Sequence, residues 1–138
     1  GTCDFYFGST IDAITDKDQF FRQNRDSLNR FYGLIVDDLA KTVFKISSNT
    51  KSIHFFFDPE SSSIAFNRSR TLFFNFAYFQ NTESSIRSRA FWFMTFCHEL
   101  AHNFIQNHDV QHEFYMSSFA ETYLLDFINT LQSNNQSL

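Results

Sequence analysis

Three residues near the middle of the C-terminal half have the types and spacing of a hydrolytic metal site. His98 and His102 are four positions apart, and Glu99 directly follows the first of them. Side chains at positions i and i+4 lie on the same face of a helix, so both imidazoles can reach one ion. Zinc accepts neutral imidazole nitrogens at about 2.0–2.1 Å, and a carboxylate beside it can act as general base. The pattern therefore predicts a catalytic zinc ion held by His98 and His102, with Glu99 activating the bound water.

A catalytic zinc ion also needs a third protein ligand and an open position for water. The chain offers three candidates, His108, Glu121 and His112. A straight helix would carry His108 about 9 Å along its axis from His102. This choice therefore requires the chain to turn, and Asn107 could adopt a left-handed conformation there. Glu121 has the spacing found in gluzincins, with 18 residues between it and His102. His112 has a second interpretation, as a cap of the next helix or as a support for a ligand.

Four further residues near the motif carry polar or thiol side chains. Tyr115 could donate a hydrogen bond to the oxyanion of a tetrahedral intermediate, or it could pack beside the site as a helix aromatic. Asn103 and Asp109 could orient the imidazoles, or they could serve as turn and capping residues. Cys97 precedes a predicted ligand but points about 100° away around the helix, so we expect it to be buried and inert.

The metal motif requires a helix, and the residues around it have helical periodicity. The apolar stripe of this helix is predicted to consist of Ile86, Ala90, Phe93, Met94, Cys97, Ala101 and Phe104. We expect its cap at Ser84 or Ser85, and a second helix from about Glu113 to Leu131. The buried face of this second helix is predicted to hold Phe114, Phe119, Tyr123, Leu124, Phe127, Ile128 and Leu131. Residues 132–138 are polar and predict a frayed tail.

The N-terminal part of the chain predicts one long helix and a small sheet. Apolar residues recur at helical spacing from Phe20 to Ile46, and the helix could bend near Gly33. Residues 52–58 predict one strand, and residues 63–79 predict two strands around a turn at 67–70. The expected fold class is therefore α+β. It comprises a long N-terminal helix, a small antiparallel sheet, the HExxH helix and a C-terminal helix.

The composition and the charge favour one packed domain. The chain has 138 residues, 43% of them hydrophobic, with 21 Phe against 3 Gly and 1 Pro. The net charge of −4 disfavours nucleic acid as a partner, and no apolar run is long enough to span a membrane. The two cysteines do not make a disulfide framework, so we expect an intracellular location, cytoplasmic or nuclear. Residues 1–138 are expected to be a single domain taken from a larger protein.

Two stretches of the sequence resemble a known kind of HExxH region. They are "HELAHN" at 98–103, which is followed by His108, His112 and the pair Phe114-Tyr115, and "IAFNRSRTLFFNFAYF" at 64–79. Together they resemble the C-terminal region of very large proteins of fungi and plants that have sacsin-like or heat-shock-chaperone-like ATPase domains. The resemblance extends from about Ile64 to Phe119, and it departs near Ser117, where those proteins tend to carry an acidic residue.

More distantly, the HELxHN segment and the later histidine are similar to the WLM and SprT-like zinc metalloproteases. In those proteins the later histidine is the third zinc ligand, so the resemblance implies His108 rather than Glu121 or His112. They cleave proteins that are crosslinked to DNA. The DNA part of that substrate does not extend to this chain, because its acidic composition lacks the basic bias of a DNA-binding surface.

The sequence thus predicts a compact, zincin-like metallopeptidase domain. Its zinc ion would be held by His98, His102 and His108, and it would act as an endopeptidase on a protein or peptide substrate. The substrate could pair in extended form with a sheet edge near Leu72–Phe76. Other domains of the same large chain are the other expected partners. The alternative is a zinc-stapled structural or interaction domain of a large chaperone-like protein, in which a fourth side chain closes the zinc site.

Overall fold

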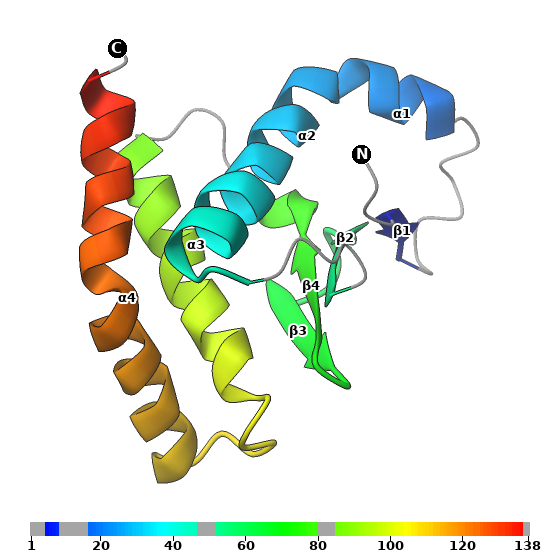
Figure 1. The fold of residues 1–138 in the computed structure, drawn as a ribbon. Helices are drawn as coiled ribbons and strands as arrows, with labels where there is room; N and C mark the ends of the chain where they lie inside the picture. The colour runs from blue at the N-terminus through cyan, green and yellow to red at the C-terminus, as the bar shows by residue number, and fades with distance from the viewer. Residues whose placement is uncertain (1–4, 9–16, 47–51, 80–84, 137–138) are drawn as a thin grey trace.

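A computed structural model of the chain describes residues 5–8, 17–46, 52–79 and 85–136. In this structure a small four-stranded sheet lies beside a group of helices (Figure 1). The helices α3 (Ser85–Ala101) and α4 (Val110–Gln136) form an antiparallel pair, and the helix η1 (Gly33–Val43) packs against both of them. The predicted α+β fold class is therefore confirmed.

The predicted long N-terminal helix consists of three consecutive segments. These are α1 (Lys17–Gln23), α2 (Arg25–Tyr32) and η1. The first break is at Asn24, where the backbone leaves helical geometry and the side-chain Nδ2 donates to the carbonyl oxygen of Phe20 at 2.8 Å. The second change is at Gly33, where the α-helix continues as a π-helix. The bend expected near this glycine is thus a change of helix type.

The sheet differs from the prediction in the direction and the order of its strands. Its order is β1 (Phe5–Phe7), β2 (Ile53–Phe57), β4 (Thr71–Asn75), β3 (Ala65–Arg68). The pairs β1–β2 and β2–β4 are parallel, and only β3–β4 is antiparallel. The predicted antiparallel sheet is therefore wrong. The connection after β2 leads to the outer edge, and the chain returns through a hairpin so that β4 lies beside β2 with the same direction.

The order of the strands also changes which strand is the edge. The predicted edge at Leu72–Phe76 is wrong, because β4 lies between β2 and β3. Among the described strands, β1 and β3 are the two edges, and β3 is the one that lies against α3. The predicted turn of the hairpin is confirmed, and Ser69 and Arg70 have positive φ angles of 52° and 67°. Two such residues in succession are typical of the type I′ turns that fit the twist of paired strands.

Aromatic side chains fill the space between the sheet and the helices. Phe31 of α2 contacts Phe55 of β2 and Trp92 of α3, with ring centroids 5.4 and 4.8 Å apart. Phe74 of β4 contacts Phe96 of α3 at 5.2 Å. The most deeply buried side chains of this core are Phe31, Ile35, Leu39, Val43, Phe74, Trp92, Phe96 and Cys97. The core therefore fixes α3 against the sheet along the helix that carries the HExxH motif.

A buried amide, that of Asn75, holds the connection between β2 and β3 in place. Its Oδ1 accepts hydrogen bonds from the backbone N–H groups of Asp58 and Ala77, both at 3.1 Å. Its Nδ2 donates to the carbonyl oxygens of Asp58 at 2.9 Å and Ser63 at 3.0 Å. The amide is thus fully satisfied although the side chain is 0% exposed. It orders the segment that leads into the edge strand.

The two C-terminal helices confirm the predicted elements but not all of their boundaries. Of the two predicted caps of α3, Ser85 is its first residue and Ser84 lies outside the described residues. The helix α4 begins at Val110 and continues to Gln136. The predicted frayed tail is therefore wrong for residues 132–136, and residues 137–138 lie outside the described part. None of the described helices is both long enough and apolar enough to cross a membrane.

Several side chains that were predicted to be buried on these helices are exposed. On α3 and just after it they are Ile86, Met94 and Phe104, and on α4 they are Phe114, Leu124 and Ile128. The sheet and η1 cover a narrower face of the helices than the apolar stripe of the sequence suggests. Phe127 is buried, and Phe119, Tyr123 and Leu131 pack against the core as predicted.

Candidate metal centre

The last turn of α3 places the first two histidines on one face. His98 and Glu99 lie within the helix, and His102 follows its last residue. From here the backbone tightens: His102 N donates to Glu99 O at 3.2 Å, and Phe104 N donates to Ala101 O at 3.0 Å. These bonds span three residues instead of four, so the helix closes and the chain turns.

The turn brings a third imidazole back to the first two. The Nε2 atom of His108 lies 3.2 Å from Nε2 of His98 and 3.0 Å from Nε2 of His102. The turn that the sequence required is therefore present. It does not depend on a left-handed Asn107, because the positive φ angles among the described non-glycine residues are at Lys45, Ser69 and Arg70.

Hydrogen bonds alone do not explain the close approach of the three ring nitrogens. An imidazole nitrogen has one in-plane position, which holds either a proton or a lone pair. His108 Nε2 can therefore make one good hydrogen bond, yet it lies within 3.2 Å of two other nitrogens. Ligands at about 2.0–2.1 Å from a tetrahedral zinc ion lie about 3.3 Å apart. The observed separations are close to that value.

The hydrogen bonds and the burial of two rings suit them to bind a cation. His102 Nδ1 lies 2.9 Å from the carbonyl oxygen of Ile105, so Nδ1 carries the proton and Nε2 presents its lone pair to the cluster. The pKa of His98 is lowered to about 4, chiefly by burial and in smaller part by the nearby His112, His102 and His108. Near neutral pH this ring is therefore uncharged, which is the state that metals bind.

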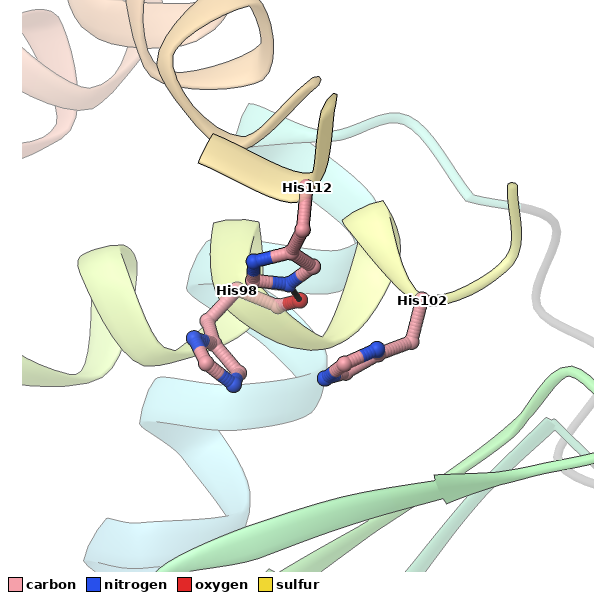
Figure 2. A group of neighbouring side chains, drawn as sticks. All are labelled: His98, His102 and His112. Carbon is pink, nitrogen blue, oxygen red and sulfur yellow. Dashed lines mark hydrogen bonds between the residues drawn. The ribbon is translucent and has the colours of Figure 1, made fainter. Parts of the chain in front are cut away.

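A fourth imidazole, that of His112, lies above the first two (Figure 2). Nitrogen atoms of His98, His102 and His112 lie within 4.8 Å of one another, close enough to hold a metal ion. However, the Nε2–H of His112 donates to the carbonyl oxygen of His98 at 3.1 Å. His108 is exposed and places Nε2 within 3.2 Å of both earlier rings, whereas His112 is buried and its Nε2 is bonded to the backbone.

The carboxyl group of Glu99 lies next to these imidazoles. Its side chain is buried, and Oε2 lies 3.9 Å from His98 Nε2. That distance is too long for a hydrogen bond but suits a water molecule between the two groups. Burial raises the pKa of Glu99 to about 7. A carboxyl group with this pKa can accept and return a proton near neutral pH.

The edge strand is tied to the motif by Asn67, a residue that the sequence analysis did not assign to the site. Its Nδ2 donates to the backbone oxygen of Glu99 at 2.8 Å and to Asn103 Oδ1 at 2.7 Å. Its Oδ1 accepts from the N–H of Arg70 at 3.1 Å. The one available signal was that Asn67 belongs to the "IAFN" stretch that carried part of the resemblance. Asn103 therefore anchors a strand here instead of orienting an imidazole.

A cleft of about 760 Å³ opens beside His98 and Glu99. One wall is the segment 62–65, which leads into β3, and the other is the exposed face of α3 from Arg87 to Glu99. Met116 of α4 also lines it. Glu99 therefore forms part of the wall of an open groove, although its side chain is buried.

The remaining predicted site residues lie around or outside the cluster. Asp109 caps α4, because its Oδ1 accepts from the N–H of His112 at 3.0 Å. The ring of Tyr115 stacks on Phe104 at 5.1 Å, as expected for a packed helix aromatic, and its role as an oxyanion donor stays a prediction. Glu121 is exposed on α4, about 13 Å along the helix axis from His112. The structure does not bring it to the histidines.

The thiol next to the first histidine behaves as predicted. Cys97 is 0% exposed, and burial raises its pKa to about 12. The thiol therefore stays protonated at neutral pH and is inert toward metals and electrophiles.

No protein-family model, curated protein or solved structure matches this chain. The resemblance to the sacsin-related and SprT-like proteins therefore stays a prediction. The interpretation of the site depends on its own residues, distances and chemistry.

Proposed function

We propose that this chain is a zinc-dependent metallopeptidase domain that cleaves peptide bonds within a protein or peptide substrate. The observation that carries the proposal is the position of Glu99. Its carboxyl group is buried, has a pKa raised to about 7, and lies beside converging imidazole nitrogens at an open cleft. Burying a carboxyl group destabilises a fold, and such groups concentrate at functional sites.

His98, His102 and His108 would hold the ion through their Nε2 atoms. Neutral imidazole nitrogens suit zinc, and their separations of 3.0 and 3.2 Å are close to those around a tetrahedral ion. When bound, zinc would supply a nucleophile from water near neutral pH and would polarise the carbonyl group of the substrate.

Glu99 would transfer the proton. It would accept a proton from the attacking water and donate it to the departing amine nitrogen, so that hydrolysis yields a carboxylic acid and an amine. Its pKa of about 7 in the metal-free protein would fall near a cation, which favours the carboxylate that a general base requires.

The free edge of β3 would bind the substrate backbone. Ile64 O accepts from Asn75 N at 2.8 Å, so alternate residues of this strand bond to β4. The alternation of an antiparallel pair directs the backbone groups of Ala65 and Asn67 away from β4. An extended peptide could add there as a further strand. Since Asn67 also bonds to Glu99 O, that peptide would lie next to the motif.

Elemental analysis of zinc tests the ligand set. The parent should hold near-stoichiometric zinc, His108→Ala should lose it, and Glu121→Ala, which changes an exposed residue of α4, should keep it. Glu99→Gln should keep zinc while its peptide cleavage falls about 10²- to 10⁴-fold, because Gln cannot accept the proton. A Glu99→Gln variant that cleaves as fast as the parent would contradict the mechanism.

A structural zinc site is the second candidate, and the proximity of His112 favours it. His112 offers a nitrogen within 4.8 Å of those of His98 and His102. If it closed the fourth position, no site would remain for water. Loss of zinc from both His108→Ala and His112→Ala, together with no cleavage by the zinc-loaded parent, would support this function instead.

A further inference from the structure

The cleft beside the motif has an apolar middle. Along one face of α3 it is lined by Phe91 and Met94, which are spaced so that they follow each other toward His98. These two side chains are 42% and 41% exposed. Ile64 lies on the opposite wall, and Met116 of α4 completes the lining. Apolar side chains grouped in an open groove are typical of a surface that a ligand covers.

The two ends of the cleft carry different polar groups. His98 and Glu99 lie at one end and Arg87 at the other. Arg87 precedes His98 by eleven positions on the same helix, which corresponds to about 16 Å along the axis. An extended peptide spans that distance with about five residues. A guanidinium group at this position suits a carboxylate of the ligand.

We propose that the cleft binds an extended peptide segment with a bulky apolar side chain near the scissile bond. The same segment carries a carboxylate about five residues from that bond. The apolar side chain would lie between Met94 and Ile64, and Arg87 would bind the carboxylate. This inference rests on the proposed peptidase function for the position of the scissile bond. The cleft itself gives the chemical class of the ligand.

Peptide binding to zinc-loaded Glu99→Gln protein tests the proposal without cleavage. Fluorescent peptides would carry Leu or Ser at one position, and Glu or Lys three residues to either side of it, because Met94 lies seven positions, or about 10 Å along the helix axis, from Arg87. We expect the peptide with Leu to bind about tenfold or more tightly than the peptide with Ser, because the cleft removes the side chain from water. The peptide with Glu should bind more tightly than the one with Lys. Equal affinity for all of these peptides would overturn the proposal.

Matched variants in the same background locate the binding surface. Met94→Glu should weaken binding of the Leu peptide about tenfold, whereas Leu125→Glu, which places the same charge on an exposed apolar position of α4, should not. Arg87→Glu should reverse the preference between Glu and Lys, and Arg30→Glu on α2 should leave it unchanged. Phe91→Ser supplies a second cleft variant should Met94→Glu fold poorly. Equal effects of the cleft variants and their controls would overturn the assignment.

Failure of this proposal is distinguishable from failure of the proposed function. If the zinc-loaded parent cleaved peptides with no preference for an apolar side chain, the proposed binding role of the cleft would be wrong. The peptidase function would still be supported. Selective binding that Met94→Glu weakens about tenfold, without cleavage by the zinc-loaded parent, would support the cleft as a peptide-binding site and contradict the proposed peptidase function.

Discussion

His98 and Glu99 are neighbours in the sequence whose pKa values are shifted in opposite directions by the same cause. Burial is the main cause that lowers the pKa of His98 to about 4 and raises that of Glu99 to about 7, because each charged form is less stable away from water. Near neutral pH the metal-free site therefore contains a neutral imidazole and a carboxyl group close to its midpoint. The imidazole is ready to bind a metal, and the carboxyl group can exchange a proton.

Replacing Glu99 by Gln should stabilise the metal-free protein at alkaline but not at acidic pH. The pKa of about 7 in the folded state lies above the ordinary value of 4.5, so folding favours the protonated carboxyl group. That stability is fully present below pH 4.5 and is lost as the pH rises through 7. Glu99→Gln should therefore raise the free energy of unfolding by up to about 3 kcal/mol at pH 8 and by little at pH 4.5. Urea unfolding with a chelator measures it; a difference independent of pH would contradict this account.

The elements around the site are held together by hydrogen bonds of backbone groups and of the Asn67 and Asp109 side chains, more than by contacts of the histidines. The last turn of α3, the loop that carries His108 and the edge strand β3 are separate in sequence. Asn67 joins the strand to the helix end, and Asp109 caps α4, which begins at Val110 and has His112 in its first turn. These bonds fix the distance between the proposed substrate edge and the carboxyl group of Glu99.

Removing the amide of Asn67 should loosen this junction. Asn67→Ala loses two hydrogen bonds to α3 and its turn, those to Glu99 O and to Asn103 Oδ1, and should lower the free energy of unfolding by about 1–3 kcal/mol. Asn67→Asp should destabilise at least as much, because a carboxylate would face two acceptor oxygens. Asn29→Ala, an exposed position of α2, is the matched control. Thermal unfolding compares the three variants, and an Asn67→Ala protein as stable as the control would show that the junction is not supported by this amide.

At the scale of the whole molecule, a bound ion would connect two parts of the chain that the fold places near each other. The proposed ligands come from α3 and from the segment between α3 and α4. Zinc at a free concentration of 100 times its Kd should raise the free energy of unfolding by about 2.7 kcal/mol. The parent and Glu121→Ala should therefore unfold at a higher temperature with zinc than with a chelator, and His108→Ala should not. A parent with the same unfolding temperature in both conditions would contradict the metal site.

Much of the local structure followed from the sequence because it depends on short-range patterns. Helical spacing predicted the helix that carries His98 and ends just before His102, and the two apolar stretches around residues 67–70 predicted the hairpin. The requirement for a turn before His108 also followed from helix geometry. The predicted antiparallel sheet failed for a long-range reason, since the position of β3 at the edge depends on where the chain crosses after β2.

The sequence by itself determined which residues could bind a metal and that a carboxyl group would accompany them, because residue type and spacing of four fix one face of a helix. Only the tertiary structure showed how the candidate third ligands lie relative to the first two histidines. It placed His108 Nε2 within 3.2 Å of both earlier histidines, committed His112 Nε2 to a backbone oxygen, and left Glu121 exposed on α4. It also raised the pKa of Glu99, since burial depends on the packing of the whole domain and not on neighbouring residues.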